Sequence, residues 1–174
     1  MTTPVYLHGL ESGPEGTKGA FIKNRYGRSG PQMPAHADRR PDQRPASFTR
    51  CVDVAARYLS ENPAPIIVGS SFGGAVALEL IHRQLWFGPI VLLAPACARY
   101  GLDLRLPEGC HAIVIHDPED EIVPYADSEK LVRLNPNAAE LWASDGGHRL
   151  STITGNGMLA QAVETQLSRS SEEP

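Results

Sequence analysis

Five short runs of mostly apolar residues, many of them β-branched, recur along the chain, and longer segments of helical periodicity separate them. Strands that helices cover on both faces have this continuous apolar character, and their alternation with helices is typical of parallel sheets. The expected strands are Val5 to Leu7, Ile66 to Gly69, Ile90 to Leu93, Ala112 to His116 and Ala139 to Ala143. The expected helices are Thr17 to Tyr26, Phe48 to Asn62, Phe72 to Leu85, Tyr125 to Leu134 and Gly157 to Leu167. We therefore predict an α/β fold, a three-layer αβα sandwich around a mostly parallel central sheet.

The order of these elements also predicts where a site would form. Because crossovers between parallel strands are right-handed, the helices are expected in two layers, with the loops at the carboxyl ends of the strands along one edge. The segment 27–45 is rich in arginine and proline and breaks the pattern. We expect a long surface connection there, with room for a short edge strand near Gln32 and Met33, since proline is tolerated at sheet edges. Residues 1–167 are expected to form a single domain, and the polar residues 168–174 a frayed tail.

Charge and length limit the classes of function. The 174 residues suit one domain with a buried core, and 16 Lys and Arg against 20 Asp and Glu give a net charge of −4. Such a chain should repel phosphate backbones and anionic lipid, so nucleic acid is an unlikely partner. No apolar stretch is long enough to span a bilayer, and the first residues have no signal-peptide pattern, so we expect no membrane insertion and a cytoplasmic location.

Cofactor signatures are not found in the sequence. The cysteines Cys51, Cys97 and Cys110 are scattered and lack CxxC spacing, so buried reduced thiols are expected, with neither a disulfide scaffold nor a zinc site. The glycine-rich stretches have neither the Walker order nor the GxGxxG form of phosphate-binding loops. We therefore expect no metal and no nucleotide cofactor. The oligomeric state is not indicated.

The strongest chemical signal is the segment 69–74, GSSFGG, between an expected strand and an expected helix. It has the form G-x-S-x-G, in which a sharp strand-to-helix turn strains the central serine and leaves its hydroxyl exposed. Gly69 and Gly73, two residues to either side of the serine, leave room for neighbouring backbone at this turn. Ser71 is therefore the expected nucleophile and Ser70 part of the turn. The Phe72 N–H, at the helix N-terminus, is an expected donor to a developing oxyanion.

A serine nucleophile needs a general base, and His148 has the most suitable setting. It lies in the segment 144–149, SDGGHR, a glycine-containing loop after the last expected strand from which an imidazole reaches the sheet edge. The remaining histidines fall in helical, strand-flanking or loop positions, where core or surface roles are more common: His8, His36, His82, His111 and His116.

The base in turn needs a carboxylate that fixes its tautomer. The turn 116–124, HDPEDEIVP, follows an expected strand and offers four acids. Asp120 is the preferred candidate because it lies mid-turn, ahead of Ile122 and Val123, which can anchor it against the core. With this choice the nucleophile, the acid and the base follow one another in that order along the chain. The other aspartates considered are Asp117, the second choice, and Asp145.

A second oxyanion donor is expected after the first strand, in the stretch 6–10, YLHGL. Gly9 permits an unusual turn beside the elbow, which makes the Leu10 N–H the preferred donor. His8 is expected to support this loop and not to act as a base.

Together these residues resemble the α/β-hydrolase superfamily, in which an HG-x loop, a GxSxG elbow, an acid turn and a GGH loop occur in this order. Within it the chain is most similar to the small, lidless YqiA-type esterases, through the opening YLHGLES with Lys18 following and the GSSxGG elbow. The resemblance implies a triad of Ser71, Asp120 and His148, with Leu10 and Phe72 as oxyanion donors. Two features depart from the pattern: Asp117 replaces the usual glycine of the acid turn, and the arginine-rich loop replaces an early strand.

These features predict a serine esterase that acts through an acyl-enzyme on a small-molecule acyl substrate. The segment 94–110 is too short for a substantial lid, so we expect an open, shallow site for small acyl groups or a surface-presented ester. Tyr100, Ile122 and Val123 are the expected substrate contacts. Two alternatives remain: an acyl-CoA thioesterase whose arginine-rich loop binds the anionic carrier, and a non-catalytic ligand-binding protein with this fold. For that loop, a solvated surface role is favoured over ligand binding.

Overall fold

The helices and strands follow each other much as the apolar pattern predicts. The computed structural model describes residues 3–34 and 44–171. Its strands are β1 (Val5–Leu7), β2 (Ile67–Ser70), β3 (Ile90–Leu93), β4 (Ala112–His116) and β5 (Ala139–Ala143). Its helices are α1 (Thr17–Tyr26), α2 (Arg44–Glu61), α3 (Phe72–His82), α4 (Tyr125–Leu134) and α5 (Met158–Ser170), with short 3₁₀ turns η1 (Ala98–Tyr100) and η2 (Gly147–Arg149).

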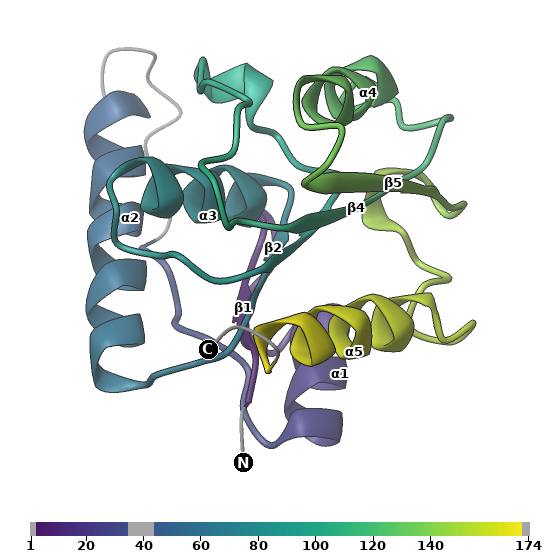
Figure 1. Cartoon of the computed structure of the whole chain (residues 1–174). Helices are drawn as coiled ribbons and strands as arrows, with labels where there is room; N and C mark the ends of the chain where they lie inside the picture. Colours follow the sequence, from purple (N-terminus) through teal and green to yellow (C-terminus); the bar gives the residue numbers. More distant parts are fainter. Residues whose placement is uncertain (1–2, 35–43, 172–174) are drawn as a thin grey trace.

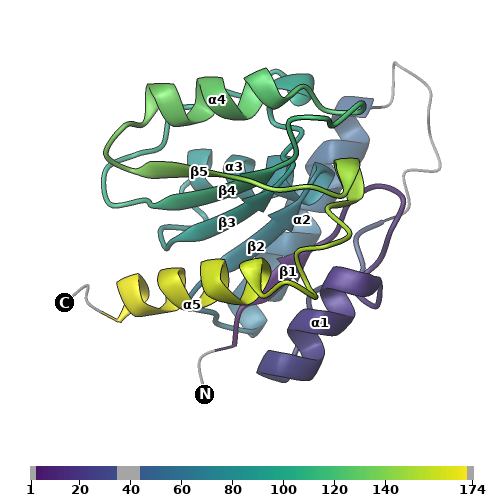
Figure 2. The same ribbon diagram turned by 90° about the vertical axis from the view of Figure 1, so that its right-hand side faces the viewer.

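The five strands form one parallel sheet in the order β1-β2-β3-β4-β5. Each strand lies beside the one that precedes it in sequence, always in the same direction across the sheet. Right-handed crossovers therefore place α2, α3 and α4 on one face of the sheet. The helices α1 and α5 cover the other face (Figures 1 and 2). This is the three-layer αβα sandwich that the sequence predicts, and its sheet is parallel throughout.

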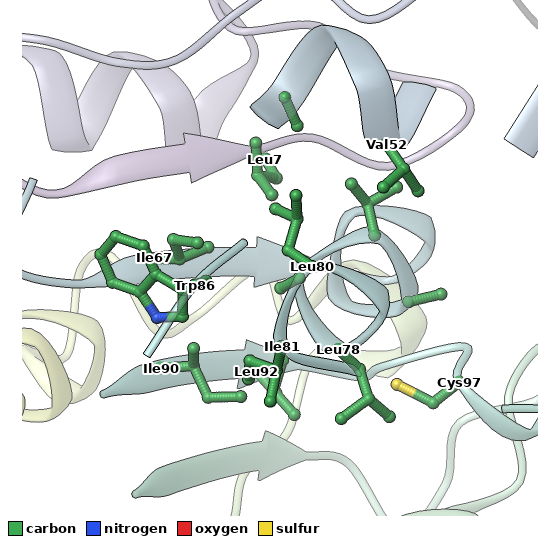
Figure 3. Packing of buried hydrophobic residues seen from close by; sticks show 14 of the residues in the cluster. Leu7, Val52, Ile67, Leu78, Leu80, Ile81, Trp86, Ile90, Leu92 and Cys97 are labelled. Atoms are coloured by element: carbon green, nitrogen blue, oxygen red, sulfur yellow. The ribbon is translucent and has the colours of Figure 1, made fainter. Parts of the chain in front are cut away.

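Alternate residues of each central strand face opposite apolar layers. Ile90 and Leu92 of β3 belong to the layer under α2, α3 and α4, whereas Val91 and Leu93 pack toward α1 and α5. Figure 3 shows the first layer, where Leu80 of α3 lies among side chains of the sheet. Each fully buried aliphatic side chain stabilises the fold by about 1.5–3 kcal/mol. Burial on both faces explains why the strands are apolar without alternation.

Four of the five expected strands have the predicted bounds, and β2 is shifted by one residue. The helix α3 ends at His82, three residues before the expected end at Leu85, because Gln84 adopts a positive φ of 58°. The turn that follows lets Trp86 pack inward, where its indole N–H donates to the Gly88 carbonyl.

The edge strand expected near Gln32 and Met33 is wrong, since residues 28–34 contain no strand. A single backbone bond, from Tyr6 N–H to Ser29 O, joins this segment to β1. The Met33 N–H donates instead to the ring of His8, and the prolines on either side of Gln32 and Met33 have no N–H to offer. The rest of the arginine-rich connection, residues 35–43, lies outside the described residues.

The expected frayed tail is also partly wrong, because α5 continues to Ser170. The guanidinium of Arg169 binds Gln166 on the same helix and Glu140 on β5, which holds the last turn against the sheet. Residues 172–174 lie outside the described part.

The segment between β3 and β4 contains only η1 and turns, so no helical lid is inserted there. The buried side chain of Asn135, just after α4, binds the backbone of this segment. Its amide donates to Leu104 O and its carbonyl accepts from Leu106 N–H.

Within residues 3–34 and 44–171, no helix is long and apolar enough to cross a membrane.

Candidate active site

Ser71 occupies a strained turn between β2 and α3. Its φ of 51° and ψ of −110° are unusual for a residue with a side chain. A Cβ atom at Gly73 would lie 2.0 Å from Leu7 O, and one at Gly69 would lie 2.6 Å from Gly73 O. Only glycine fits both positions. The G-x-S-x-G spacing therefore reports a close backbone approach among β1, β2 and α3.

Backbone hydrogen bonds hold this turn against β3. The Ser71 N–H donates to Leu93 O at 2.8 Å, and the Ser71 carbonyl accepts from Gly74, Ala75 and Ala96 N–H. The backbone of Ser71 is thus fixed on both sides by main-chain hydrogen bonds, at the carboxyl edge of the sheet.

His148 reaches Ser71 from η2, a turn that follows β5. Its Nε2 lies 2.9 Å from Ser71 Oγ, and the ring is 21% exposed. Gly146 and Gly147 have φ values of 95° and 63°, and a Cβ at Gly146 would lie 2.5 Å from Ser151 N. The paired glycines therefore permit the loop that carries the imidazole.

Asp120 lies on the far side of the same imidazole. Its Oδ2 is 2.7 Å from His148 Nδ1, and its Oδ1 accepts from Ile122 N–H at 2.8 Å and Val123 N–H at 2.9 Å. A carboxylate beside Nδ1 fixes the tautomer in which Nδ1 donates and Nε2 can accept from Ser71. The structure thus brings Ser71, His148 and Asp120 into one chain of hydrogen bonds.

The carboxylate of Asp120 is held ionised although its side chain has no solvent exposure. Burial acts to raise its pKa, but the bonds from Val123 N–H, His148 and Ile122 N–H outweigh burial and lower the pKa below the ordinary value. Asp120 can therefore stabilise a positive charge on His148.

The two aspartates of the acid turn have different partners. Asp117 Oδ2 accepts from Gly147 N–H at 2.6 Å, and its Oδ1 accepts from Glu119 N–H at 2.8 Å. Asp117 thus ties the loop before His148 to the acid turn, while Asp120 contacts the imidazole itself. Asp145, the third aspartate considered, is exposed and accepts from Thr152 Oγ1.

The sequence alone assigns no role in the site to His116, and it indicates Lys18 only as part of the family resemblance. His116, treated above as a core or surface residue, is fully buried with Nε2 3.0 Å from Asp120 Oδ2. The position of His116 at the end of β4, four residues before Asp120, is the sequence feature that points to this contact. Lys18 of α1 donates from Nζ to Arg149 O at 2.6 Å, which fastens the His148 loop to the first helix. Burial, and then the charge of Arg149, lower the Lys18 pKa.

The loop after β1 packs directly against the elbow. A Cβ at Gly9 would lie 3.6 Å from Ser71 Cβ, so the backbone leading to Leu10 passes beside the serine. His8 supports this loop: its Nδ1 lies 2.8 Å from Gly9 O, and its Nε2 accepts from Met33 N–H at 3.0 Å. Burial lowers the His8 pKa, with the Gly9 contact opposing, which favours the neutral ring that this arrangement requires.

The expected substrate contacts fall into three different settings. Tyr100 is half-buried and stacks on Phe48, with ring centroids 4.9 Å apart, and it meets Phe72 edge-on at 5.3 Å. Ile122 is 58% exposed. Val123 is only 2% exposed, and its backbone binds Asp120 and His116, so it belongs to the acid turn and does not fit the contact role expected for it.

The other histidines lie elsewhere. His82 contacts Arg105 O from the end of α3, His111 lies at the opposite end of β4, and His36 is outside the described residues. Among the described residues, no three His, Cys, Asp or Glu side chains form a group able to hold a metal ion.

All three cysteines are buried thiols, as expected. Burial raises the pKa of Cys51 to about 11 and that of Cys97 to about 12.

Comparison with solved structures defines the fold class as that of the α/β hydrolases. The ydeN gene product from B. subtilis is 18% identical, with a TM-score of 0.74 over 97% of this chain and 100% of its own. A protein from Xanthomonas campestris pv. campestris, described as a "putative hydrolase of the alpha/beta superfamily", is 22% identical, with a TM-score of 0.67 over 95% of this chain and 99% of its own. Mouse alpha/beta hydrolase domain-containing protein 10 is 14% identical, with a TM-score of 0.67 over 93% and 89%.

The chain belongs to the family described as "Uncharacterised protein family (UPF0227)", which matches residues 3–108. This match contains the loop after β1 and the elbow. A comparison with curated proteins found no match.

The bond from Lys18 to Arg149 generates a prediction about the His148 loop. Lys18→Met keeps most of the side chain's length but removes a charge-assisted hydrogen bond, which typically contributes about 1.5–3 kcal/mol. Hydrogen exchange of residues 147–153 should accelerate about 10-fold or more, measured by mass spectrometry. Lys23→Met, on the same helix in an exposed pair with Glu15, is the matched control and should leave this loop unchanged. Equal exchange in the two variants would show that Lys18 does not hold the loop.

Proposed function

We propose that this protein is a serine hydrolase that cleaves carboxylic esters through an acyl-enzyme. The observation that supports it most strongly is the chain of hydrogen bonds from Ser71 Oγ to His148 Nε2, at 2.9 Å, and from His148 Nδ1 to Asp120 Oδ2, at 2.7 Å. These three groups come from three separate loops at one edge of the sheet, and their alignment gives each the contact that nucleophilic catalysis needs.

In the proposed mechanism, His148 Nε2 takes the Ser71 proton as Oγ attacks the ester carbonyl. The tetrahedral intermediate collapses when His148 returns that proton to the leaving alcohol, and the acyl group stays on Ser71. Water then attacks the acyl-enzyme while His148 takes a proton from it, and the carboxylic acid leaves as Ser71 is reprotonated. Asp120 stays ionised throughout and stabilises the imidazolium in both halves of the reaction.

The oxyanion of each intermediate is proposed to bind the backbone N–H groups of Leu10 and Phe72. Phe72 is the first residue of α3, so its backbone N–H lies at the positive end of the helix dipole, where negative charge is stabilised. Leu10 belongs to the loop that Gly9 brings against Ser71. One such donor typically contributes about 3 kcal/mol to transition-state stabilisation.

The proposed substrate is an ester with a small acyl group, or one presented on a surface. Two of the large apolar side chains that are exposed among the described residues, Leu10 at 47% and Ile122 at 58%, belong to the loops that carry the proposed oxyanion donor and acid. The connection between β3 and β4 is short and held down by Asn135. We propose that these exposed side chains contact the acyl group, and no helical lid is inserted between β3 and β4 to enclose a long chain. A cytoplasmic location remains part of the proposal.

The acyl-CoA alternative has no comparable support among the described residues. Arg28 donates to the carbonyls of Thr3 and Pro63, and Arg25 pairs with Glu164, so both guanidinium groups already have partners. The side chains of Arg39, Arg40 and Arg44 lie outside the described part. Turnover of acetyl-CoA beside a simple acetate ester distinguishes the two activities.

Substitutions in the three proposed catalytic residues test the mechanism. Ser71→Ala, His148→Ala and Asp120→Asn should each lower kcat for p-nitrophenyl butyrate by about 10⁴-fold, because each breaks the proton path or the base's tautomer. Circular dichroism should show an unchanged fold. Asp145→Asn, an exposed aspartate of the His148 loop, is the matched control and should keep near-normal kcat. An active Asp120→Asn with an inactive Asp117→Asn would reassign the acid, and a fully active Ser71→Ala would refute the mechanism.

Acyl-chain length tests the shallow site. Across p-nitrophenyl esters, kcat/KM should be highest for acetate or butyrate and fall by about 10-fold or more at decanoate, since longer chains gain little buried contact there. A rise in kcat/KM toward decanoate would contradict this description of the site.

A further inference from the structure

A second imidazole contacts the carboxylate that binds His148. The Oδ2 atom of Asp120 lies 2.7 Å from His148 Nδ1 and 3.0 Å from His116 Nε2. The ring of His116 is fully buried at the carboxyl end of β4, and Asp120 has no side-chain exposure. The same oxygen that faces the proposed base therefore also faces a second nitrogen, and the side chains of Asp120 and His116 are both buried.

The partners of His116 determine which of its nitrogens carries a proton. Its Nε2 faces two acceptors, Asp120 Oδ2 and the Val123 carbonyl at 3.1 Å, so Nε2 must be the donor. Its Nδ1 lies 2.7 Å from the hydroxyl of Ser128, which is buried on α4 and can donate to a neutral ring. The ring is thus held between α4 and the acid turn, with its N–H directed at the carboxylate.

Other groups near His116 do not compete for this contact. Tyr125 of α4 meets the His116 ring edge-on, with centroids 5.5 Å apart. The neighbouring carboxylate of Asp117 is bound to the N–H groups of Gly147 and Glu119. Asp120 is therefore the carboxylate to which His116 donates, and His148 is the other titratable group on that carboxylate.

We propose, on the basis of the proposed hydrolase function, that His116 is a positioning residue that orients the Asp120 carboxylate and draws part of its negative charge away from His148. With both Oδ1 and Oδ2 held by donors, the carboxylate keeps a single orientation through the reaction. A carboxylate that also accepts from His116 interacts less strongly with a positive charge on His148 than an unshared carboxylate would.

This role predicts the direction in which the profile of kcat/KM against pH moves when His116 is replaced. Without the His116 N–H, the full charge of Asp120 faces His148 and stabilises its imidazolium. The acid limb of the profile of kcat/KM against pH, which reports protonation of the base, should then move to higher pH. A merely structural histidine would lower stability or activity but would leave the position of that limb unchanged.

The test compares three variants with the unaltered protein. His116→Phe keeps a ring but removes the donor, and it should move the acid limb upward by about one pH unit. It should lower kcat/KM at pH 7 by about 10-fold or more, with partial recovery at pH 9. His116→Gln retains a side-chain N–H and should return the limb toward its original position. The matched control is His111→Phe, just before the opposite end of the same strand, which should leave the limb in place.

Two outcomes overturn the proposal while leaving the hydrolase function intact. One is a folded, measurable His116→Phe whose acid limb stays at its original pH. The other comes from the unaltered protein and applies even where His116→Phe does not fold: ¹⁵N chemical shifts that show His116 Nε2 unprotonated at pH 7. A protonated Nε2 with Nδ1 as acceptor supports the proposal. If the unaltered protein hydrolyses no ester at all, the proposed function fails and the positioning role fails with it.

Discussion

The close packing of backbone at the elbow is the constraint on which the remaining structure depends. Gly73 lies so near Leu7 O, and Gly69 so near Gly73 O, that no side chain fits between β1, β2 and α3. The strained conformation of Ser71 persists because the sheet and α3 hold both sides of it, with the Ser71 N–H bound to β3. The contacts of the buried parallel sheet offset the backbone strain of this turn. The turn then directs the Ser71 hydroxyl toward the loops at the carboxyl edge.

Those loops are organised around one buried carboxylate. Asp120 receives two backbone N–H groups on Oδ1 and two imidazoles on Oδ2, so its desolvation is offset by four hydrogen-bond donors. Asp117 and Lys18 act at a distance from the reacting atoms, since both bind backbone of the loop that carries His148. The ring of His148 is therefore bound by Asp120, and the residues before and after His148 are bound by Asp117 and Lys18. These contacts restrict movement of the imidazole away from Ser71.

The apolar pattern predicts nearly all of the strand bounds, since β1 to β4 are buried on both faces and burial leaves little choice of residue. The elbow is equally readable, since close backbone approach demands glycine at fixed spacing. Contacts between segments are harder to foresee. Strand alternation places His116 on the face of β4 toward α4, but only the fold of the acid turn brings its ring to Asp120. Likewise, nothing local in Gln32 and Met33 indicates that the Met33 N–H binds His8 in place of a neighbouring strand.

Covalent labelling tests most directly whether Ser71 is an activated nucleophile. A fluorophosphonate probe reacts with a serine whose proton has a nearby base and whose developing oxyanion has donors. At neutral pH the probe should modify the protein once, at Ser71 and not at Ser70, as located by peptide mass spectrometry, and His148→Ala should abolish the modification. A correctly folded protein whose Ser71 stays unlabelled would contradict the account.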